Sequence, residues 1–400
     1  MSQYILIIFI IEIVVLSKID RLIYGTIITP ITILSIPYGI IVLLAIFVGP
    51  SLGFVSFNFD SLWIWIFGIF IFWLPGIFLS VLILPKTNIH KNPFLLYDNQ
   101  HLDKVILKLS YIAIVILSVE LLLTLKIAPI GSDNFQAAFG GGISGHTLMA
   151  SRFFFIALIV KYKKKYNIPL LILLFFFISY GVKGWIFIPI ISGLFVRIIL
   201  RKTTLSIWFI TKLLLSSFLL FYTVYRIAIG PQMPIKFVFT HFMTYIFSGP
   251  LGLSEYLKQN NEIGFDPGVI VNPLINIYNH FLGDGELYNY KNIMTNIGGD
   301  ISTNTKTFFG TIYIYSGSFW GIIYTLIFGA MTYSFLIISL KTKDLIFLVI
   351  YGTFLTMLFF AWFDSYTGNL FFYEFPTFGI LLYLTYNTLR KKNNPIMQHT

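Results

Sequence analysis

Apolar runs long enough to cross a lipid bilayer follow one another along most of this sequence, and they restrict the fold more than any other feature. A membrane-spanning helix needs roughly 17–25 consecutive apolar residues. Because backbone polar groups in lipid must be hydrogen-bonded within helices or closed barrels, and these runs lack the alternation of barrel strands, each run predicts a helix. The runs lie near residues 3–17, 25–48, 62–84, 105–125, 146–160, 168–182, 185–200, 204–225, 311–340, 344–363 and 369–388.

Charged residues are too few to cover a water-soluble globule. They make up 11% of the 400 residues, and hydrophobic residues make up 57%. Soluble proteins carry about 25% charged residues. The sequence therefore predicts an all-α polytopic integral membrane protein of about 10–12 transmembrane helices. No internal repeat or low-complexity tract is visible, so we expect a single membrane domain over residues 1–400.

Basic residues gather between the apolar runs, and the positive-inside rule assigns such clusters to the cytoplasm. This assignment leaves the N-terminus outside, the C-terminus inside and one long polar stretch, 226–310, on the outer face. The net charge of +11 follows from this topology and does not indicate a nucleic-acid partner. The strongest clusters lie at 161–165, 201–202, 341–343 and 390–392.

The stretch 226–310 is predicted to be one large periplasmic or extracellular loop that carries the function. Loops longer than about 12–15 residues are usually functional or disordered. This one has more aromatic and aliphatic residues than a disordered segment usually has, so we expect it to be functional. Its asparagines interleave with tyrosines, and Asn amides can pair with sugar hydroxyls. A polar surface loop without a ligand has a similar composition. Within the stretch, residues 237–253 predict an interfacial or re-entrant helix.

Nucleotide and metal motifs give little support for a cofactor. The chain has no G-x-x-x-x-G-K-[ST] motif, and no cysteine. Gly140, Gly142 and Gly145 match G-x-G-x-x-G without the preceding strand that dinucleotide binding requires. Asp284 and Glu286 could hold a divalent cation, but a solvated turn explains them equally well. We expect no cofactor and no bound metal.

Three basic residues on the predicted outer side oppose the positive-inside trend. Arg152 lies inside an apolar helix, Lys183 in a tight turn, and Arg226 at the end of a span. Cations near the outer ends of three predicted helices would suit a dianionic ligand such as a pyrophosphate. Each has a structural alternative: Lys183 and Arg226 could be interfacial anchors, and Arg152 could pair with Glu120.

His146 and His241 are the candidate general bases near the outer surface. The ordinary pKa of histidine, about 6.5, lets the side chain accept a proton near neutral pH. Each is a lone histidine in sequence, so a structural role is the alternative in both cases.

The layout resembles the Wzy-type polymerases of O-antigen and capsular polysaccharide, which carry one dominant external loop late in the chain. The turn at 181–184 (Gly-Val-Lys-Gly) resembles the family's Gly-x-(Arg/Lys)-Gly turn, and Tyr225-Arg226 resembles its loop-entry arginine. Ser316 and Ser318 stand where the family's Asp-x-Gly-x-x-Gly run often has its Asp and first glycine. The rest of the resemblance is carried by Asn304-Thr305-Lys306-Thr307, Tyr313, Tyr315 and Gly321.

The resemblance implies a glycosyltransferase of the bacterial inner (cytoplasmic) membrane. Such enzymes transfer the growing glycan from undecaprenyl pyrophosphate to the non-reducing end of a lipid-linked repeat unit at the outer face. Arg152, Lys183 and Arg226 would stabilise the leaving pyrophosphate, and His241 or His146 would serve as base. The implied partners are the lipid-linked oligosaccharide, membrane lipid, a chain-length regulator and a flippase.

Two other functions fit the same sequence. One is a lipid-linked oligosaccharide flippase or other transporter, although no internal pseudo-symmetry is visible. The other is a different outer-face glycan enzyme, such as an O-antigen ligase.

Overall fold

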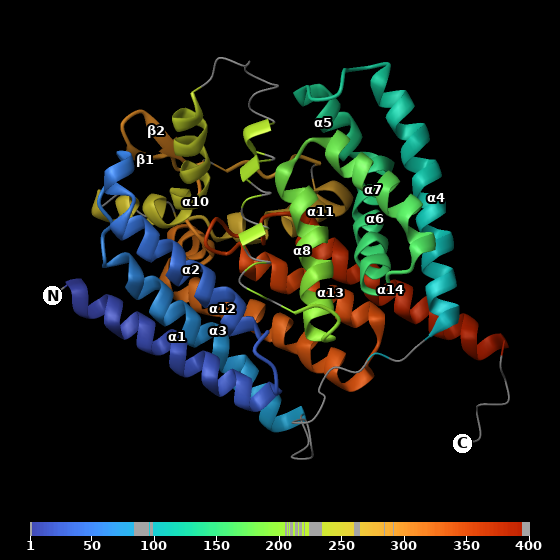
Figure 1. Cartoon of the computed structure of the whole chain (residues 1–400), viewed down its shortest axis with the longest axis horizontal. Helices are drawn as coiled ribbons and strands as arrows, with labels where there is room; N and C mark the ends of the chain where they lie inside the picture. The colour runs from blue at the N-terminus through green and yellow to red at the C-terminus, as the bar shows by residue number, and fades with distance from the viewer. Residues whose placement is uncertain are drawn as a thin grey trace. The chain divides into compact units, whose positions relative to one another are not determined.

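A computed structural model shows a chain that is mostly helical (Figure 1). In the part of the chain that the structure describes, strands occur only in one short hairpin. The described residues are 2–83, 96, 99–204, 206, 208, 211–212, 215, 218–219, 221–223, 234–259, 265–283, 285–290 and 292–393.

The chain divides into two compact units, each assembled from segments distant in sequence. Unit 1 takes residues 1–91, 204–333 and 358–369, and unit 2 takes residues 92–203, 334–357 and 370–400. The prediction of a single membrane domain stays a prediction.

Unit 1 contains the N-terminal helices and most of the stretch that was predicted as a loop. Its helix α2 starts with Pro30 at its first position and is capped by the Thr29 hydroxyl, which accepts from the backbone N–H of Thr32. The elements of the unit are α1 (Ser2–Tyr24), α2 (Pro30–Phe47), η1 (Pro50–Leu52), α3 (Ser61–Ile83), α10 (Ile235–Lys258), η3 (Pro267–Val271), α11 (Asn272–Leu282), β1 (Thr295–Gly298), β2 (Ile301–Thr303) and the larger part of α12 (Phe308–Thr342).

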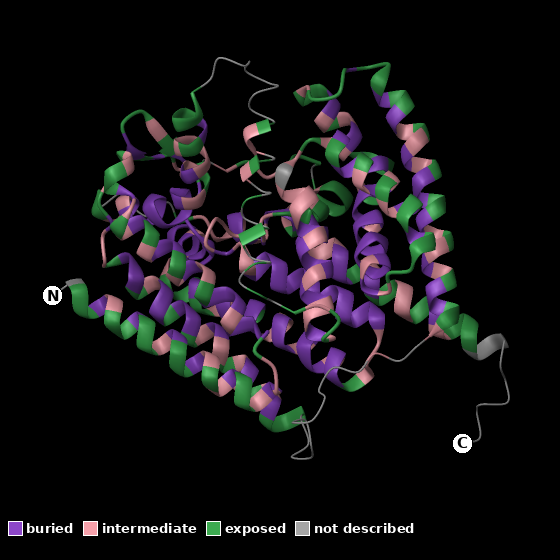
Figure 2. Cartoon of the chain, viewed as in Figure 1, coloured by how far each residue is buried: buried purple, intermediate pink, exposed green. Residues whose placement is uncertain are grey.

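Unit 2 surrounds one deeply buried helix, α6, which Figure 2 shows as mainly buried. Its elements are α4 (Gln100–Leu125), α5 (Asp133–Gly140), α6 (Gly142–Val160), η2 (Lys164–Tyr166), α7 (Asn167–Tyr180), α8 (Lys183–Ile199), most of α13 (Leu345–Phe359), and α14 (Leu370–Asn393).

Five of the described helices are long and apolar enough to cross a membrane, namely α2, α3, α4, α6 and α12. Residues 184–199 and α13 add shorter apolar helices. The prediction of an all-α, multi-pass membrane protein is therefore confirmed in its coarse form, while the number of spans stays a prediction. The predicted span 204–225 lies largely outside the described residues.

The predicted loop 226–310 contains a large share of regular structure. Helix α10 covers the predicted helix 237–253, and η3, α11 and the β1–β2 hairpin follow it. The two strands are antiparallel, with Thr295 opposite Thr303. Some large apolar residues of the stretch pack in the interior, such as Phe247, Leu251 and Ile270, while others, such as Phe281 and Leu282, are exposed.

Glycines let aromatic rings pack against the helices of unit 1. A Cβ on Gly68 would lie 2.5 Å from the ring of Phe309, and one on Gly76 would lie 2.6 Å from the ring of Tyr333. Small residues are the usual means of close helix approach in membranes, where the apolar lipid removes most of the hydrophobic driving force.

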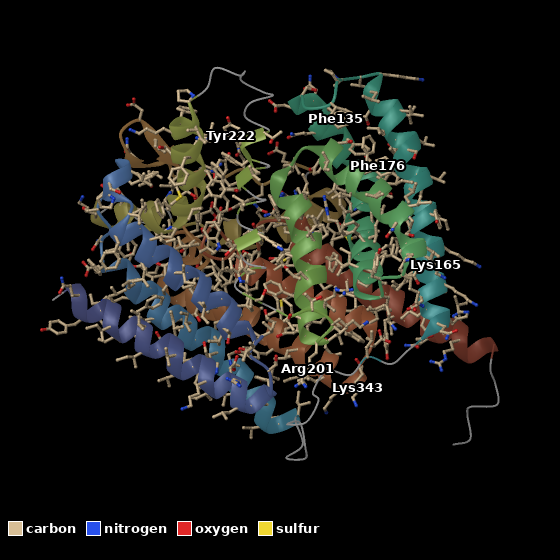
Figure 3. The ribbon with its side chains drawn as sticks, viewed as in Figure 1. Phe135, Lys165, Phe176, Arg201, Tyr222 and Lys343 are labelled. Carbon is tan, nitrogen blue, oxygen red and sulfur yellow. The ribbon has the colours of Figure 1, made fainter. Side chains whose placement is uncertain are left out.

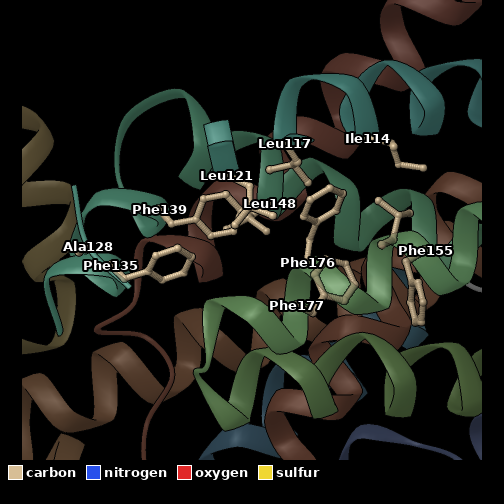
Figure 4. Packing of buried hydrophobic residues seen from close by; sticks show 11 residues of the cluster. Ile114, Leu117, Leu121, Ala128, Phe135, Phe139, Leu148, Phe155, Phe176 and Phe177 are labelled. Atoms are coloured by element: carbon tan, nitrogen blue, oxygen red, sulfur yellow. The ribbon is translucent and has the colours of Figure 1, made fainter. Parts of the chain in front are cut away.

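The core of unit 2 is built from aromatic and aliphatic side chains of α4 to α7 (Figure 4). Phe155 of α6 meets Phe177 of α7 edge to face, with ring centres 5.4 Å apart. Arg201 and Lys343 lie at the opposite end of this unit from Phe135 in Figure 3.

Helix α12 is interrupted at Gly317. The helix runs over 35 residues, but Gly317 has φ 64° and ψ −172°, so its backbone is not helical there. Only glycine adopts this conformation readily.

Candidate functional site

Arg152 is the most unusual residue of unit 2. It lies in α6, which has the length and hydropathy of a membrane span, and its side chain is only 4% exposed. Among the described residues, no carboxylate lies within 4.0 Å of its guanidinium, so the structure does not pair it with Glu120. A buried, unpaired charge is costly in any protein and more so in lipid.

Three aromatic rings surround the guanidinium. Its carbon Cζ lies 4.4 Å from the ring centre of Trp185, which is close enough for a strong cation–π contact. The other two rings are Phe371 at 5.6 Å and Phe177 at 5.7 Å. Rings stabilise the positive charge without using its N–H donors, so the planar donor fork stays available for oxygen atoms of a ligand.

The hydrogen-bonding capacity of Arg152 is unused in the described part of the chain. Its Nε is buried and has no partner there. Tyr180 and Glu374 lie near enough to act on the guanidinium electrostatically, but neither of these two described side chains is hydrogen-bonded to it. The arrangement therefore provides a cation with free donors in an apolar surrounding.

His146 lies on the same helix, less than two turns before Arg152. Its Nδ1 is 2.5 Å from a carboxylate oxygen of Glu374, and the side chains are 65% and 22% exposed. Glu374 follows Phe371 by one turn of α14, so one face of α14 serves both His146 and Arg152. A carboxylate on Nδ1 orients the ring and leaves Nε2 to exchange a proton.

The turn at 181–184 explains how Trp185 reaches Arg152. Gly181 ends α7 with φ 79°, a left-handed conformation suited to a helix C-terminus. Helix α8 begins two residues later at Lys183 and carries Trp185 in its first turn. The tight turn predicted at this point is confirmed, while the side chain of Lys183 lies outside the described residues.

Of the remaining predicted site residues, His241 is the one whose side chain the structure describes. His241 lies on α10 in unit 1, where its ring packs between those of Phe237 and Tyr245. Arg226 lies outside the described residues, and so does Asp284 of the alternative cation site. Of the five predicted residues, the structure thus places His146 and Arg152 in one cluster.

A second cluster of charged groups, in unit 1, was not predicted from the sequence. Lys306 is 1% exposed, and its ammonium donates to the carbonyl oxygens of Ile293 at 3.0 Å and Thr303 at 3.2 Å. Burial lowers the pKa of Lys306 to about 8, and the nearby charge of Asp364 opposes that shift.

Asp364 completes this cluster from the turn between α13 and α14. Its Oδ1 accepts from the hydroxyl of Thr311 and from the backbone N–H of Ser365, both at 2.8 Å. Burial raises the pKa of Asp364 to about 6 against the lowering effect of these hydrogen bonds and of Lys306. No ion pair within 4.0 Å joins Lys306 to Asp364, although both are among the described residues.

Helix α10 holds the two chain segments that carry these charges. A Cβ on Gly249 would lie 2.1 Å from the carbonyl oxygen of Trp362, and one on Gly252 would lie 2.3 Å from that of Thr305. The segments also pair directly, since the N–H of Phe308 donates to the carbonyl of Ala361 at 2.7 Å. Lys306 and Asp364 are therefore fixed by backbone contacts.

One sequence signal could have pointed to Lys306, because it belongs to the motif at 304–307 that carries part of the family resemblance. Asp364 gave no signal, since an acidic residue in a predicted outer turn is ordinary. Among the described residues, no three His, Cys, Asp or Glu side chains are grouped so that they could hold a metal ion.

Comparison with known proteins gives a family but no activity. The model of a family of unknown function, DUF6337, matches residues 53–393, so the chain belongs to that family. No curated protein and no solved structure matches the chain.

Proposed function

We propose that this member of the DUF6337 family is an oligosaccharide repeat-unit polymerase of the bacterial cytoplasmic membrane. In this proposal the chain has about 10–12 spans, and residues 226–310 face the outside. The enzyme transfers the growing glycan from undecaprenyl pyrophosphate to the non-reducing end of a lipid-linked repeat unit. A chain-length regulator and a flippase act beside it.

The observation that supports the proposal best is the state of Arg152. A guanidinium 4% exposed in an apolar helix is stabilised by rings and keeps a buried Nε without a partner. An anionic ligand that reaches it gains charge-assisted hydrogen bonds in an apolar surrounding, where such bonds are strong. A lipid-linked pyrophosphate is an anion that a membrane helix meets at the lipid surface.

The same site provides what departure of a pyrophosphate requires. Negative charge develops on the leaving oxygen, and a fixed cation stabilises it most when no solvent has to reorganise. His146, oriented by Glu374, lies on the same helix with Nε2 available for proton exchange. Lys183 and Arg226 remain proposed further cations for the pyrophosphate, and His241 remains the alternative base.

A flippase or an O-antigen ligase would bind the same lipid pyrophosphate, so the three functions must be distinguished by the chain lengths of the glycan that the cells make. The test is a glycan gel from cells in which this gene is deleted and then replaced by variants. The intact gene is expected to restore a ladder of repeats where the deletion leaves a single repeat. Complete loss of repeats in the deletion strain would favour the flippase or the ligase, and an unchanged ladder would refute the proposal.

Arg152 variants connect this assay to the site. Arg152→Ala is expected to reduce polymer about 100-fold or more, as loss of one transition-state donor does. Arg152→Lys keeps the charge but loses the planar set of guanidinium N–H donors. The amount of polymer is therefore expected to lie between those of the wild type and Arg152→Ala. Arg21→Ala, which removes an exposed arginine of α1, is the matched control and should leave the ladder intact. Membrane levels of each variant are measured by immunoblot, so that a folding defect is recognised.

A further inference from the structure

Helix α11 turns an apolar face outward. Five of its aromatic and aliphatic side chains follow the i, i+3, i+4, i+7 spacing of one helix face, and all five are exposed. The most exposed are Phe281 at 75% and Leu282 at 77%. A surface helix of a soluble protein directs such a face toward the core, so α11 has the reverse orientation. The other three residues of the face are Leu274, Ile277 and Tyr278.

The inner side of α11 is polar and is fixed to the rest of unit 1. Oδ1 of Asn276 accepts from the backbone N–H of Tyr288 at 2.6 Å. Asn279, three residues later and therefore on the same side, donates from Nδ2 to the carbonyl oxygen of Glu286 at 3.0 Å. The Tyr288 hydroxyl in turn donates to the carboxylate of Asp266, just before η3. These hydrogen bonds hold the helix with its apolar face outward.

The segment that leads into α11 is attached to α12. The hydroxyl of Tyr324 donates to the carbonyl oxygen of Pro267 at 3.2 Å, and α11 begins five residues after Pro267. The ring of Phe265 also packs at the break in α12, since a Cβ on Gly317 would lie 3.8 Å from it. Helix α11 therefore starts next to the part of α12 that follows the break.

This part of α12 indicates what covers the apolar face of α11. The helix is apolar and long enough to cross a membrane, so its outward side chains meet lipid. Its first exposed rings are those of Phe319 and Trp320, and tryptophan is enriched where a bilayer meets water. Helix α11 is attached at this level and has no Asp, Glu, Lys or Arg. An apolar face without charge suits lipid better than a charged partner.

We propose that α11 is an interfacial helix, whose apolar face enters the boundary between the lipid headgroups and the acyl chains. Such helices lie in the plane of the membrane and enter it by about 5–10 Å. Helix α11 thereby anchors the segment around it to the bilayer surface. Because the face has no basic residue, the contact depends on apolar area and not on anionic lipid. The inference needs α12 to cross the membrane, but it does not need the polymerase activity.

Site-specific fluorescence quenching tests this position. The chain has no cysteine, so a single introduced cysteine takes a fluorophore selectively. Phe281→Cys is made in the full-length protein, labelled and reconstituted into phosphatidylcholine nanodiscs that hold one copy each. Lipids that carry a nitroxide near the headgroup should quench the label several-fold more than lipids that carry it near the chain end. Iodide in the water should quench it weakly.

Three further labelled positions complete the experiment. Asp300→Cys lies in the exposed turn between β1 and β2 of the same unit, so its label should be quenched by iodide and hardly by lipid. Ile327→Cys lies on an exposed side of α12, ten residues beyond the break, so the nitroxide near the chain end should quench it more. Ile277→Cys, on the same face of α11, should repeat the result of Phe281→Cys and decides the test if that variant does not fold.

Each outcome supports or overturns the proposal. A label on α11 that iodide quenches as strongly as the Asp300→Cys label would place the helix in water and refute the lipid contact. A label shielded from both iodide and lipid would show that protein covers the face. Stronger quenching from the chain end would place α11 deeper than the interface, and quenching that requires phosphatidylglycerol would show attraction to charge. Because no glycan is used, these results stand whatever the glycan gel shows.

Discussion

Replacement of Asp364 by Asn is expected to make the folded protein more stable at neutral pH. Burial is the largest influence on this carboxyl and raises its pKa from 3.8 to about 6. A shift of about two units corresponds to about 3 kcal/mol of destabilisation of the charged form. Asn has no charge to desolvate, and its amide oxygen can still accept from Thr311 and Ser365.

Part of that gain is lost because Lys306 no longer has a nearby opposite charge. Burial already lowers the pKa of Lys306 to about 8, and Asp364 is the group that raises it. We therefore expect a net stabilisation of about 1–2 kcal/mol at pH 7.5, which corresponds to a melting temperature higher by a few degrees.

The pH dependence gives the sign of the effect. The folded-state pKa of Asp364 lies above its unfolded value, so the folded state binds more protons between pH 3.8 and about 6. The destabilisation by the charged carboxyl is thus complete above about pH 6 and absent below 3.8. The advantage of Asp364→Asn over the wild type should therefore shrink as the pH falls toward 4.

Thermal unfolding of both proteins, followed by tryptophan fluorescence at several pH values, measures this difference. Asp300→Asn, which removes an exposed carboxylate in the turn between β1 and β2, is the control and should follow the wild type at every pH. The reasoning is refuted if Asp364→Asn is less stable than the wild type at pH 7.5, or if its advantage does not change with pH.

Two further results are expected. Gly249→Ala should destabilise the protein by about 1–3 kcal/mol in a melting assay, because the new Cβ would lie 2.1 Å from a backbone oxygen. Gly184→Ala is the control: its Cβ would have no heavy atom within 4 Å, so the melting temperature should not change. Trp185→Leu should cost about 1–2 kcal/mol through the lost cation–π contact, and an unchanged melting temperature would argue against that contact.

The helical membrane fold could be predicted from the sequence because it depends on local hydropathy. The runs at 62–84, 105–125 and 311–340 reappear as α3, α4 and α12 with ends shifted by a few residues. The break at Gly317 could not be predicted, because a glycine inside an apolar run is common in membrane helices and its φ angle depends on tertiary contacts. The helical content of 226–310 was predicted only where apolar residues made a long run.

The candidate sites were predictable only in part, and for a related reason. Arg152 attracts attention by itself, since a charge inside an apolar helix needs an explanation. Its ring partner Phe371 and the partner of His146, Glu374, come from a helix more than 200 residues later, and no spacing rule connects them. Lys306 and Asp364 are separated by two helices and meet through backbone contacts with α10, which sequence patterns do not record.

The break at Gly317 divides α12 into two parts, and the second part is long enough to cross a membrane. The stretch 318–342 rises about 37 Å at 1.5 Å per residue, enough by itself to cross a hydrocarbon core of about 30 Å. Residues 308–316 are then surplus to the crossing and continue the segment that carries Lys306. Thr311, which holds Asp364, belongs to this surplus part. Asp364 is therefore held by a part of α12 that a membrane crossing does not need.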